Sequence, residues 1–198
     1  GKAYEKFNVI RPDNYEEYKK ALKSGQKGAE NKFNKQYGVY YTPREIVHYM
    51  CQQSLTNYLA TELEGKVNKE GIDTLIKYGE QVGENEATVE TKGRETRTYF
   101  YKLPKSIRLN AKLVDERLAD IKVCDPAVGS GAFPVGMMSE IVKTRNVLSA
   151  FIKVPDRTIY NFKRECIEKS LYGVDIDPGA VEIAKLRLWL SLVVDEED

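Results

Sequence analysis

Two acidic residues and a pair of glycines have the types and the spacing that could bind a small ligand. They lie in the segment Asp125-Pro126-Ala127-Val128-Gly129-Ser130-Gly131-Ala132-Phe133 and at Asp175. Apolar runs at 121–124 and 171–174 come directly before the two acids, and short apolar runs are typical of strands covered on both faces. A strand that ends in glycines and continues into a helix leaves backbone N–H groups free beside a crevice. Open α/β sheets bind nucleotide-like ligands in such a crevice.

The composition of the loop favours one class of nucleotide-like ligand. Its spacing matches neither G-x-G-x-x-G nor G-x-x-x-x-G-K-[ST], so neither NAD nor ATP is indicated. The carboxylate of Asp125 would repel a pyrophosphate, whereas it suits a ligand that carries an ammonium or a sulfonium group. We therefore predict S-adenosylmethionine as the cofactor. The structural alternative is a strand, a tight turn and a helix that only pack together, which two glycines by themselves would favour.

The same nine residues resemble the cofactor loop of the N6-adenine DNA methyltransferases. Two further segments resemble that family in the expected order, Tyr40-Tyr41-Thr42-Pro43 before the loop and Tyr172-Gly173-Val174-Asp175-Ile176-Asp177-Pro178 after it. The likeness is greatest to the large bacterial enzymes of type II restriction–modification and related phage-defence systems. The three motifs span residues 36–194, which is most of the chain.

The resemblance implies a role for each motif. The stretch at 41–43 would receive the carboxylate of the cofactor's methionine part at a helix N-terminus. Asp175 would accept hydrogen bonds from both ribose hydroxyls, and Ile176 would pack on the adenine ring. The alternative for Asp175 is a turn-forming aspartate, and the only histidine, His48, is expected to be a packed or surface residue and not a base. The predicted cofactor-binding residues are Tyr41, Thr42, Pro43, Asp125, Pro126, Ala127, Gly129, Gly131, Phe133, Asp175 and Ile176.

The sequence pattern also predicts the elements that would position these residues. A capping box formed by Thr42, Pro43 and Glu45 is expected to begin a helix that ends near residue 63. Further helices are expected at about 106–118, 132–150, 158–170 and 178–194, with Asp177 and Pro178 starting the last one. The strands near 121–124 and 171–174 should be parallel, because a right-handed crossover joins them. A short helix at 73–78 and a small hairpin around residues 92–93 are weaker predictions.

These elements predict an α/β fold, a truncated Rossmann-like methyltransferase core with a largely helical N-terminal part. Residues 1–35 would be a helical lead-in, residues 36–198 a partial S-adenosylmethionine-dependent methyltransferase domain, and 64–120 an insertion over the cofactor cleft. The helix at 178–194 is apolar nearly all round. In a complete enzyme it should therefore be buried on more than one side, whereas in this chain it should expose an apolar patch or form a dimer that hides one.

The bulk composition limits the partners and the compartment. The formal net charge of +1 gives no overall attraction to nucleic acid, so contacts with DNA would be local or lie outside this chain. Cys51, Cys124 and Cys166 are scattered and odd in number, as expected of reduced core residues in a cytoplasmic protein and not of a disulfide framework or a metal site. The sequence contains no pattern of a signal peptide or a membrane span.

The catalytic tetrapeptide of the family, [Asp/Asn/Ser]-Pro-Pro-[Tyr/Phe/Trp], is absent, since no Pro-Pro occurs in the 198 residues. No catalytic residue is therefore predicted in this chain. We interpret it as the N-terminal, cofactor-binding portion of a site-specific DNA (adenine-N6) methyltransferase, inactive by itself, from a restriction–modification enzyme that acts on double-stranded DNA. Two alternatives stay open. One is a methyltransferase for RNA, protein or a small molecule, and the other is a non-catalytic scaffold of a defence complex.

Overall fold

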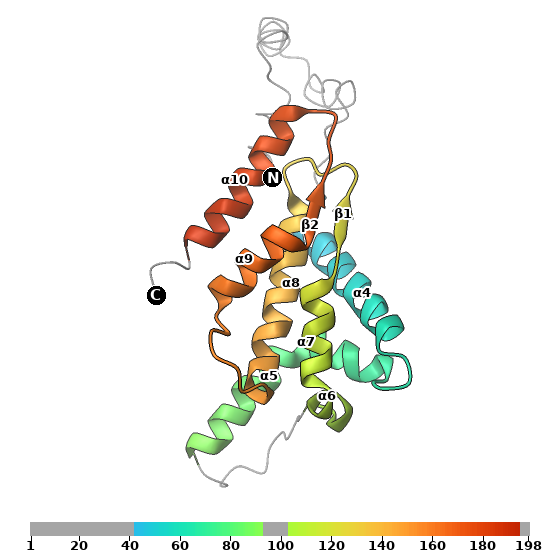
Figure 1. The fold of residues 1–198 in the computed structure, drawn as a ribbon, viewed down its shortest axis with the longest axis vertical. Helices are drawn as coiled ribbons and strands as arrows, with labels where there is room; N and C mark the ends of the chain where they lie inside the picture. The colour runs from blue at the N-terminus through green and yellow to red at the C-terminus, as the bar shows by residue number, and fades with distance from the viewer. Residues whose placement is uncertain (1–41, 93–102, 195–198) are drawn as a thin grey trace, which may run out of the picture.

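The computed structural model describes residues 42–92 and 103–194. Seven helices, a short 3-10 turn and two strands follow one another along these residues (Figure 1). In chain order they are α4 (Arg44–Glu62), α5 (Lys69–Lys92), α6 (Lys105–Leu109), α7 (Ala111–Asp120), β1 (Val123–Asp125), α8 (Ala132–Leu148), η1 (Ser149–Phe151), α9 (Ile159–Lys169), β2 (Leu171–Gly173) and α10 (Pro178–Val193). The fold is thus mostly helical with a small parallel sheet, which is consistent with part of a methyltransferase-like α/β fold.

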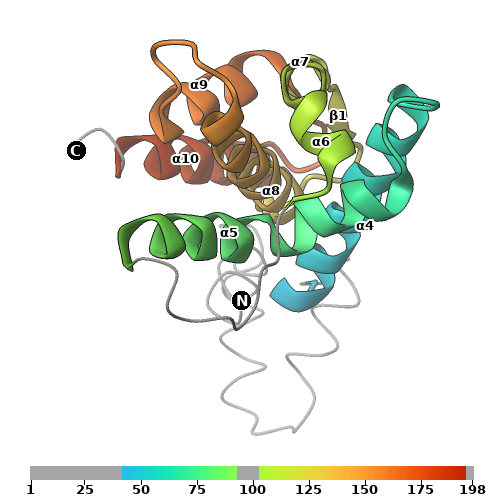
Figure 2. The ribbon, with the colours of Figure 1, turned by 90° about the horizontal axis from the view of Figure 1, so that it is seen from below.

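The core is built around α8, which contacts α4, α5, α7 and α9 (Figure 2). Met138, Ile141 and Leu148 of α8 are almost completely buried. They pack against apolar residues of the surrounding helices, among them Leu55 of α4 and Leu118 of α7. A helix at this central position needs apolar residues on several sides, and α8 has them.

The two strands are parallel, as predicted, and pair Val123 with Leu171, Cys124 with Tyr172 and Asp125 with Gly173. Successive side chains of a strand point to opposite faces. Val123 and Leu171 pack against the core, whereas Cys124 and Tyr172 are exposed. The prediction that both faces are covered is therefore wrong for the described chain, because its helices cover only one face. The expectation of three core cysteines is wrong at Cys124, while Cys51 and Cys166 are buried.

The predicted start of α10 is confirmed, whereas the predicted cap of α4 is not. Asp177 caps α10 by accepting a hydrogen bond from the Gly179 N–H at 3.0 Å, and Pro178 takes the first helical position. The capping box at Thr42 is wrong. The residue that caps α4 is Pro43, with φ −55° and ψ 145°, and no side chain bonds to this helix end. The extended conformation of Pro43 starts the helix one residue later than predicted.

The segment at 64–120 differs most from expectation. The single helix α5 covers both the short helix expected at 73–78 and the first strand of the expected hairpin, whose remainder falls among residues 93–102 outside the described part. The helix expected at 106–118 is two helices, α6 and α7, separated at Asn110. α5 and α6 lie at the end of the molecule opposite to the loops that follow the strands (Figure 1). The expectation that this segment lies over a cleft at those loops is therefore wrong for α5 and α6.

Two further predictions concern the N-terminal lead-in and membrane-spanning helices. The helical lead-in at 1–35 falls outside the described residues. Among the helices that the structure describes, none has the length and apolar character needed to cross a bilayer.

Candidate functional site

The chain leaves β1 and β2 side by side, and backbone hydrogen bonds join the two exits. The Val174 N–H donates to the Asp125 carbonyl at 2.9 Å, and the Val128 N–H donates to the Val174 carbonyl at 2.9 Å. The Gly129 N–H donates to Oδ2 of Asp175 at 2.8 Å, which joins residues 46 positions apart in sequence. The structure thus brings Asp125, the glycine loop and Asp175 together at one edge of the sheet, as predicted from the order of the strands.

The two acids differ in how their oxygens are used. Oδ1 of Asp125 accepts a hydrogen bond from the Ala127 N–H at 3.0 Å. Its Oδ2 is buried and has no hydrogen-bond partner among the described residues. A buried carboxylate oxygen without a donor is costly, so such an atom commonly marks a site that a ligand completes.

Asp175 makes the turn bond that its structural alternative requires, because its Oδ1 accepts from the Asp177 N–H at 2.9 Å. Each carboxylate oxygen can accept more than one hydrogen bond. The turn therefore does not use up the capacity of Asp175, and ribose binding stays a prediction.

Both glycines of the loop have backbone angles that favour glycine. Gly129 has φ +50° and Gly131 has φ +77°, in the left-handed region that side chains disfavour. Gly131 also lies against α10, where a Cβ atom would be 2.9 Å from the Cβ of Ala184. Any other residue at position 131 would therefore have a strained backbone and a Cβ atom that overlaps Ala184.

The expectation of several free N–H groups in the loop needs correction. The N–H groups of Ala127, Val128, Gly129 and Gly131 are all bonded within the site. The first turn of a helix has N–H groups without an intrahelical partner, and in α8 Pro134 has none to offer. The N–H groups that helix geometry leaves for a ligand are thus those at residues 132–133.

The other predicted residues surround the loop in different ways. Pro126 and Ala127 are exposed, and Ile176 is 100% exposed. Phe133 is partly buried and packs against the core. Of the segment at 41–43, Thr42 is half-buried and Pro43 exposed, and Tyr41 lies outside the described residues.

A cavity of about 400 Å³, with both charged and apolar walls, lies between the first turn of α4 and the first turns of α8. The two helices cross closely, since a Cβ atom on Gly136 would be 2.9 Å from Cγ1 of Val47. The cavity therefore lies between the start of the Thr42-Pro43 helix and the end of the glycine loop. Its walls are Arg44, Val47, His48, Ala132, Val135, Gly136, Ser139, Glu140 and Arg187.

Sequence reasoning gave no role to the charged residues of this cavity. Glu140 is 3% exposed and accepts hydrogen bonds from Lys143 Nζ at 2.7 Å and Gln52 Nε2 at 3.2 Å. Nδ1 of His48 lies 2.8 Å from Oε1 of the same carboxylate, and the His48 side chain is half-exposed, as predicted for a surface residue. Because Glu140 is satisfied internally, Arg44 and Arg187 give the cavity a positive character.

Arg187 also contacts the loop directly. Its Nη1 donates to the carbonyl oxygen of Ser130 at 2.8 Å and to the hydroxyl oxygen at 3.1 Å. The sequence carried one signal for this contact, which is a charged residue between Leu186 and Leu188 in a helix that is apolar nearly all round.

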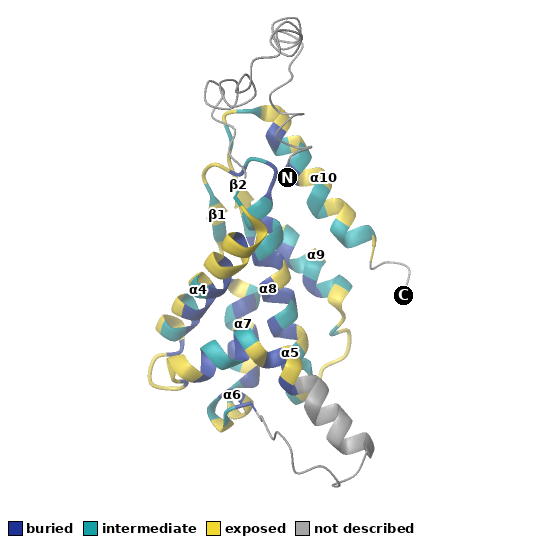
Figure 3. Ribbon diagram, turned by 180° about the vertical axis from the view of Figure 1, so that it is seen from behind, coloured by how far each residue is buried: buried dark blue, intermediate teal, exposed yellow. Residues whose placement is uncertain are grey.

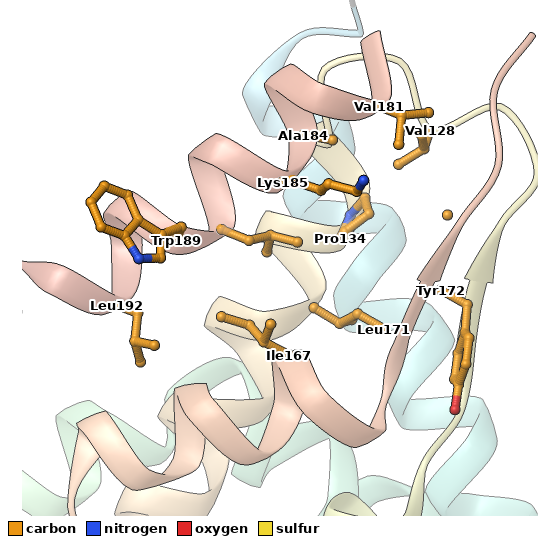
Figure 4. Close-up of a pocket in the computed structure, with 12 residues that line it drawn as sticks. Val128, Pro134, Ile167, Leu171, Tyr172, Val181, Ala184, Lys185, Trp189 and Leu192 are labelled. Carbon is orange, nitrogen blue, oxygen red and sulfur yellow. The ribbon is translucent and has the colours of Figure 1, made fainter. Parts of the chain in front are cut away.

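A second hollow, of about 330 Å³, lies under α10 and is apolar (Figure 4). It is lined by residues of α8, α9, β2 and α10, including Pro134, Ile167, Leu171, Leu188 and Trp189. Of α10 only Ala180 and Ala184 are buried. The exposed apolar patch predicted for this chain is present, with Leu186, Trp189, Leu190 and Val194 about half exposed or more. Most of α10 is exposed or half-buried (Figure 3).

Comparisons with known proteins agree with this geometry. Residues 103–196, which contain both strands, the loop and α10, match the family model described as MmeI, DNA-methyltransferase domain. The chain is 29% identical over 177 residues to a protein of Methanocaldococcus jannaschii named "Putative type II restriction enzyme and methyltransferase". That alignment covers 85% of this chain but only 12% of the relative, and no solved structure matches the chain. The likeness that the motifs predicted, to the methyltransferases of restriction–modification enzymes, is confirmed by both matches.

Proposed function

We propose that this chain is the S-adenosylmethionine-binding part of a site-specific DNA adenine-N6 methyltransferase from a restriction–modification enzyme. The observation that carries the proposal is the junction of Asp125, the glycine loop and Asp175 at the exits of two adjacent parallel strands. Crevices at such exits are the usual ligand sites of open α/β sheets. The match to a DNA-methyltransferase domain over the same residues supports this assignment.

The residues present suit that cofactor. The unpartnered Oδ2 of Asp125 would accept a hydrogen bond from the ligand or face its positive charge, and Asp175 would accept from the ribose hydroxyls. Ile176, which is fully exposed, would cover the adenine ring. The first turn of α4 at Thr42 and Pro43, with Arg44 on the adjoining cavity, would favour the carboxylate. When bound, S-adenosylmethionine supplies an activated methyl group.

We propose further that the fold is part of a Rossmann-like core. In the described chain the sheet has two strands, so each has one edge without a partner strand at which a larger sheet could continue. The proposed domain is 36–198, with 1–35 as a lead-in. Because the Pro-Pro tetrapeptide is absent, the chain would hold the methyl donor without transferring the methyl group. The whole enzyme would act on double-stranded DNA in the cytoplasm, with most DNA contacts, and any nuclease, elsewhere.

Titration calorimetry of the chain with S-adenosylmethionine tests this function. We expect saturable binding at one site, and we expect Asp175→Ala to abolish it. Glu182→Gln, at an exposed position of α10, is the control and should bind like the original chain. An absence of binding, or an affinity that Asp175→Ala leaves unchanged, would contradict the proposal.

A further inference from the structure

We infer that Arg187 is a positioning residue of the cofactor loop, which α10 holds in its binding conformation through Ser130. The inference rests on the proposed function, because it assigns a role within the same site. Arg187 is not among the residues that the sequence motifs predicted.

The contact between Arg187 and Ser130 is partly buried and consists of two hydrogen bonds. Ser130 is 7% exposed, and both of its oxygens accept from the same guanidinium nitrogen of Arg187, at 2.8 and 3.1 Å. The two residues are 57 positions apart, and α8, α9 and β2 lie between them in the chain. Hydrogen bonds from a charged donor are stronger than neutral ones. An apolar side chain at position 187 would leave the buried oxygens of Ser130 without this donor.

The peptide group between Ser130 and Gly131 also forms the hydrogen bond that closes the turn of the loop. While the Ser130 carbonyl accepts from Arg187, the N–H of this peptide, which belongs to Gly131, donates to the Val128 carbonyl at 2.8 Å. Hydrogen bonds in such a chain polarise one another. The guanidinium of Arg187 thus strengthens the bond that closes the loop at Gly131, the residue with φ +77°.

A second contact from α10 fixes the neighbouring residue. Ala184, one helical turn before Arg187, leaves room at Gly131 for a hydrogen atom but not for a Cβ. On the opposite side, Val174 and Asp175 hold Val128 and Gly129. The loop is therefore fixed from both sides, by the exit of β2 and by α10. Arg187 provides the only charged side-chain donor among these described contacts.

The consequence concerns the N–H groups at the start of α8. Their direction is set by the peptides at 130–131, because Gly131 is the N-cap of that helix. If Arg187 is removed, the loop can relax without any change to Asp125 or Asp175. We therefore expect weaker cofactor binding from a residue that acts through Ser130.

The experiment is a double-mutant cycle on the full 198-residue chain, read by calorimetry with S-adenosylmethionine. We expect Arg187→Ala to weaken binding by at least about tenfold, the effect of losing a charge-assisted hydrogen bond. Ser130→Ala should weaken binding a few-fold in the original chain and have no further effect in the Arg187→Ala chain. Lys185→Gln, two residues away on the same helix and exposed, should change nothing.

A rescue measurement separates positioning from a loss of fold. Guanidinium ion, at concentrations far below those that unfold proteins, should restore part of the affinity of Arg187→Ala, whereas sodium chloride at equal ionic strength should not. Melting curves without ligand show whether each variant is folded.

The outcomes distinguish the two proposals. If the original chain does not bind S-adenosylmethionine, the proposed function fails and this inference with it. If the original chain binds and Arg187→Ala binds equally well, only the inference is overturned. Additive effects of the two substitutions, together with no rescue by guanidinium, would also overturn it.

Discussion

At the scale of single residues, Asp125 carries the clearest sign that this site is incomplete without a ligand. One of its carboxylate oxygens bonds to the Ala127 N–H, and the other is buried without a partner in the described chain. Asp175, in contrast, has both oxygens bonded to backbone N–H groups. The first acid is therefore poised for a ligand, and the second also holds the loop together.

The substitution Asp125→Asn separates stability from binding. The amide oxygen can keep the bond to the Ala127 N–H, and the variant no longer has an unpaired charge at the buried atom. We expect a free energy of unfolding in urea that is equal or higher, and an affinity for S-adenosylmethionine lower by about tenfold. An affinity that matches the original chain would show that Asp125 does not contact the ligand.

The three cysteines should differ in reactivity. Burial raises the pKa of Cys166 to about 12, and burial together with the nearby Glu140 raises that of Cys51 to about 11. Cys124 is exposed on the open face of the sheet. Because the thiolate is the reactive form, we expect a thiol reagent to modify one cysteine quickly in the folded chain and all three after unfolding. Cys124→Ser should remove the fast reaction, and fast labelling of that variant would contradict the fold.

At the scale of elements, the molecule depends on close crossings of helices and loops. Gly131 lies against Ala184 of α10, and Gly136 brings α8 against Val47 of α4. These contacts place the loop between two helices that are distant in sequence. The conformation of the site therefore depends on how α4, α8 and α10 pack against one another.

A pair of glycine substitutions can measure the crossing at the loop. Gly65 and Gly131 have nearly the same backbone angle, φ +76° and +77°, but a Cβ at Gly65 would meet nothing within 4 Å. Gly65→Ala should cost about 1 kcal/mol, at the low end of the usual strain of a left-handed residue. Gly131→Ala adds the overlap with Ala184, so we expect a clearly larger loss in urea unfolding. Equal losses of unfolding free energy in the two variants would mean that α10 does not pack closely against the loop.

A buried ion network joins α7, α8 and α9 on the side away from the loop. Asp115 accepts from Arg145 Nε at 3.0 Å and from both terminal nitrogens of Arg157, at 2.8 and 2.9 Å. The two guanidinium groups lie over the ring of Phe162, at 4.5 and 4.9 Å from its centre. Glu165 completes the network through Arg145 Nη1 at 2.7 Å.

This network predicts how stability depends on pH. Burial alone would raise the pKa of Asp115, but the hydrogen bonds from Arg157 and Arg145 outweigh it and hold the pKa below its usual value. A carboxyl group with a lowered pKa in the folded state stabilises the protein above its unfolded pKa of about 4, and this stabilisation is lost as the pH falls through the folded value. We expect the urea concentration at the midpoint of unfolding to fall as the pH is lowered below about 4. Asp115→Asn should be less stable at pH 7 and show a flatter acid profile, and an unchanged profile would rule out this origin.

The elements that the sequence predicted well are those with local signals. Asp177-Pro178 fixes the start of α10, and Thr158 caps α9 by accepting from the Asn161 N–H at 3.1 Å. The order of apolar runs and helices was enough to predict a parallel pair. The capping box at Thr42 failed although its residue types were right, because the extended conformation of Pro43 displaced the helix start.

The predictions that failed depended on contacts remote in sequence. Burial of Cys124 depends on what covers the sheet, which a local pattern cannot show. The role of Arg187 depends on Ser130, 57 residues away. The β-branched residues at 88–91 favoured a strand by propensity, yet they lie in the long helix α5.

At the scale of the whole molecule, the helices cover one face of the sheet, and the other face and the outer side of α10 are exposed. Tyr172, Leu186, Trp189 and Leu190 are each about half exposed. Apolar patches of this kind are typical of surfaces that pack against other polypeptide. We propose that α10 pairs with a second copy of the chain in solution.

Sedimentation of the chain tests that pairing. We expect self-association that grows with concentration, and Trp189→Glu should shift the chain to a monomer because it places a charge in the apolar patch. Glu182→Lys, on the polar side of the same helix, is the control. A monomer at all concentrations, or association that Trp189→Glu leaves unchanged, would contradict the proposed dimer.

The central claim is that the exits of two parallel strands form one site for S-adenosylmethionine, and NMR of the isotopically labelled chain tests it most directly. Addition of S-adenosylmethionine should shift the backbone amide signals of residues 125–133 and 175–177 together, with one common affinity, and leave those of α6 unchanged. If the ligand shifts no signals, or shifts only signals remote from Asp125 and Asp175, the account of this site is wrong.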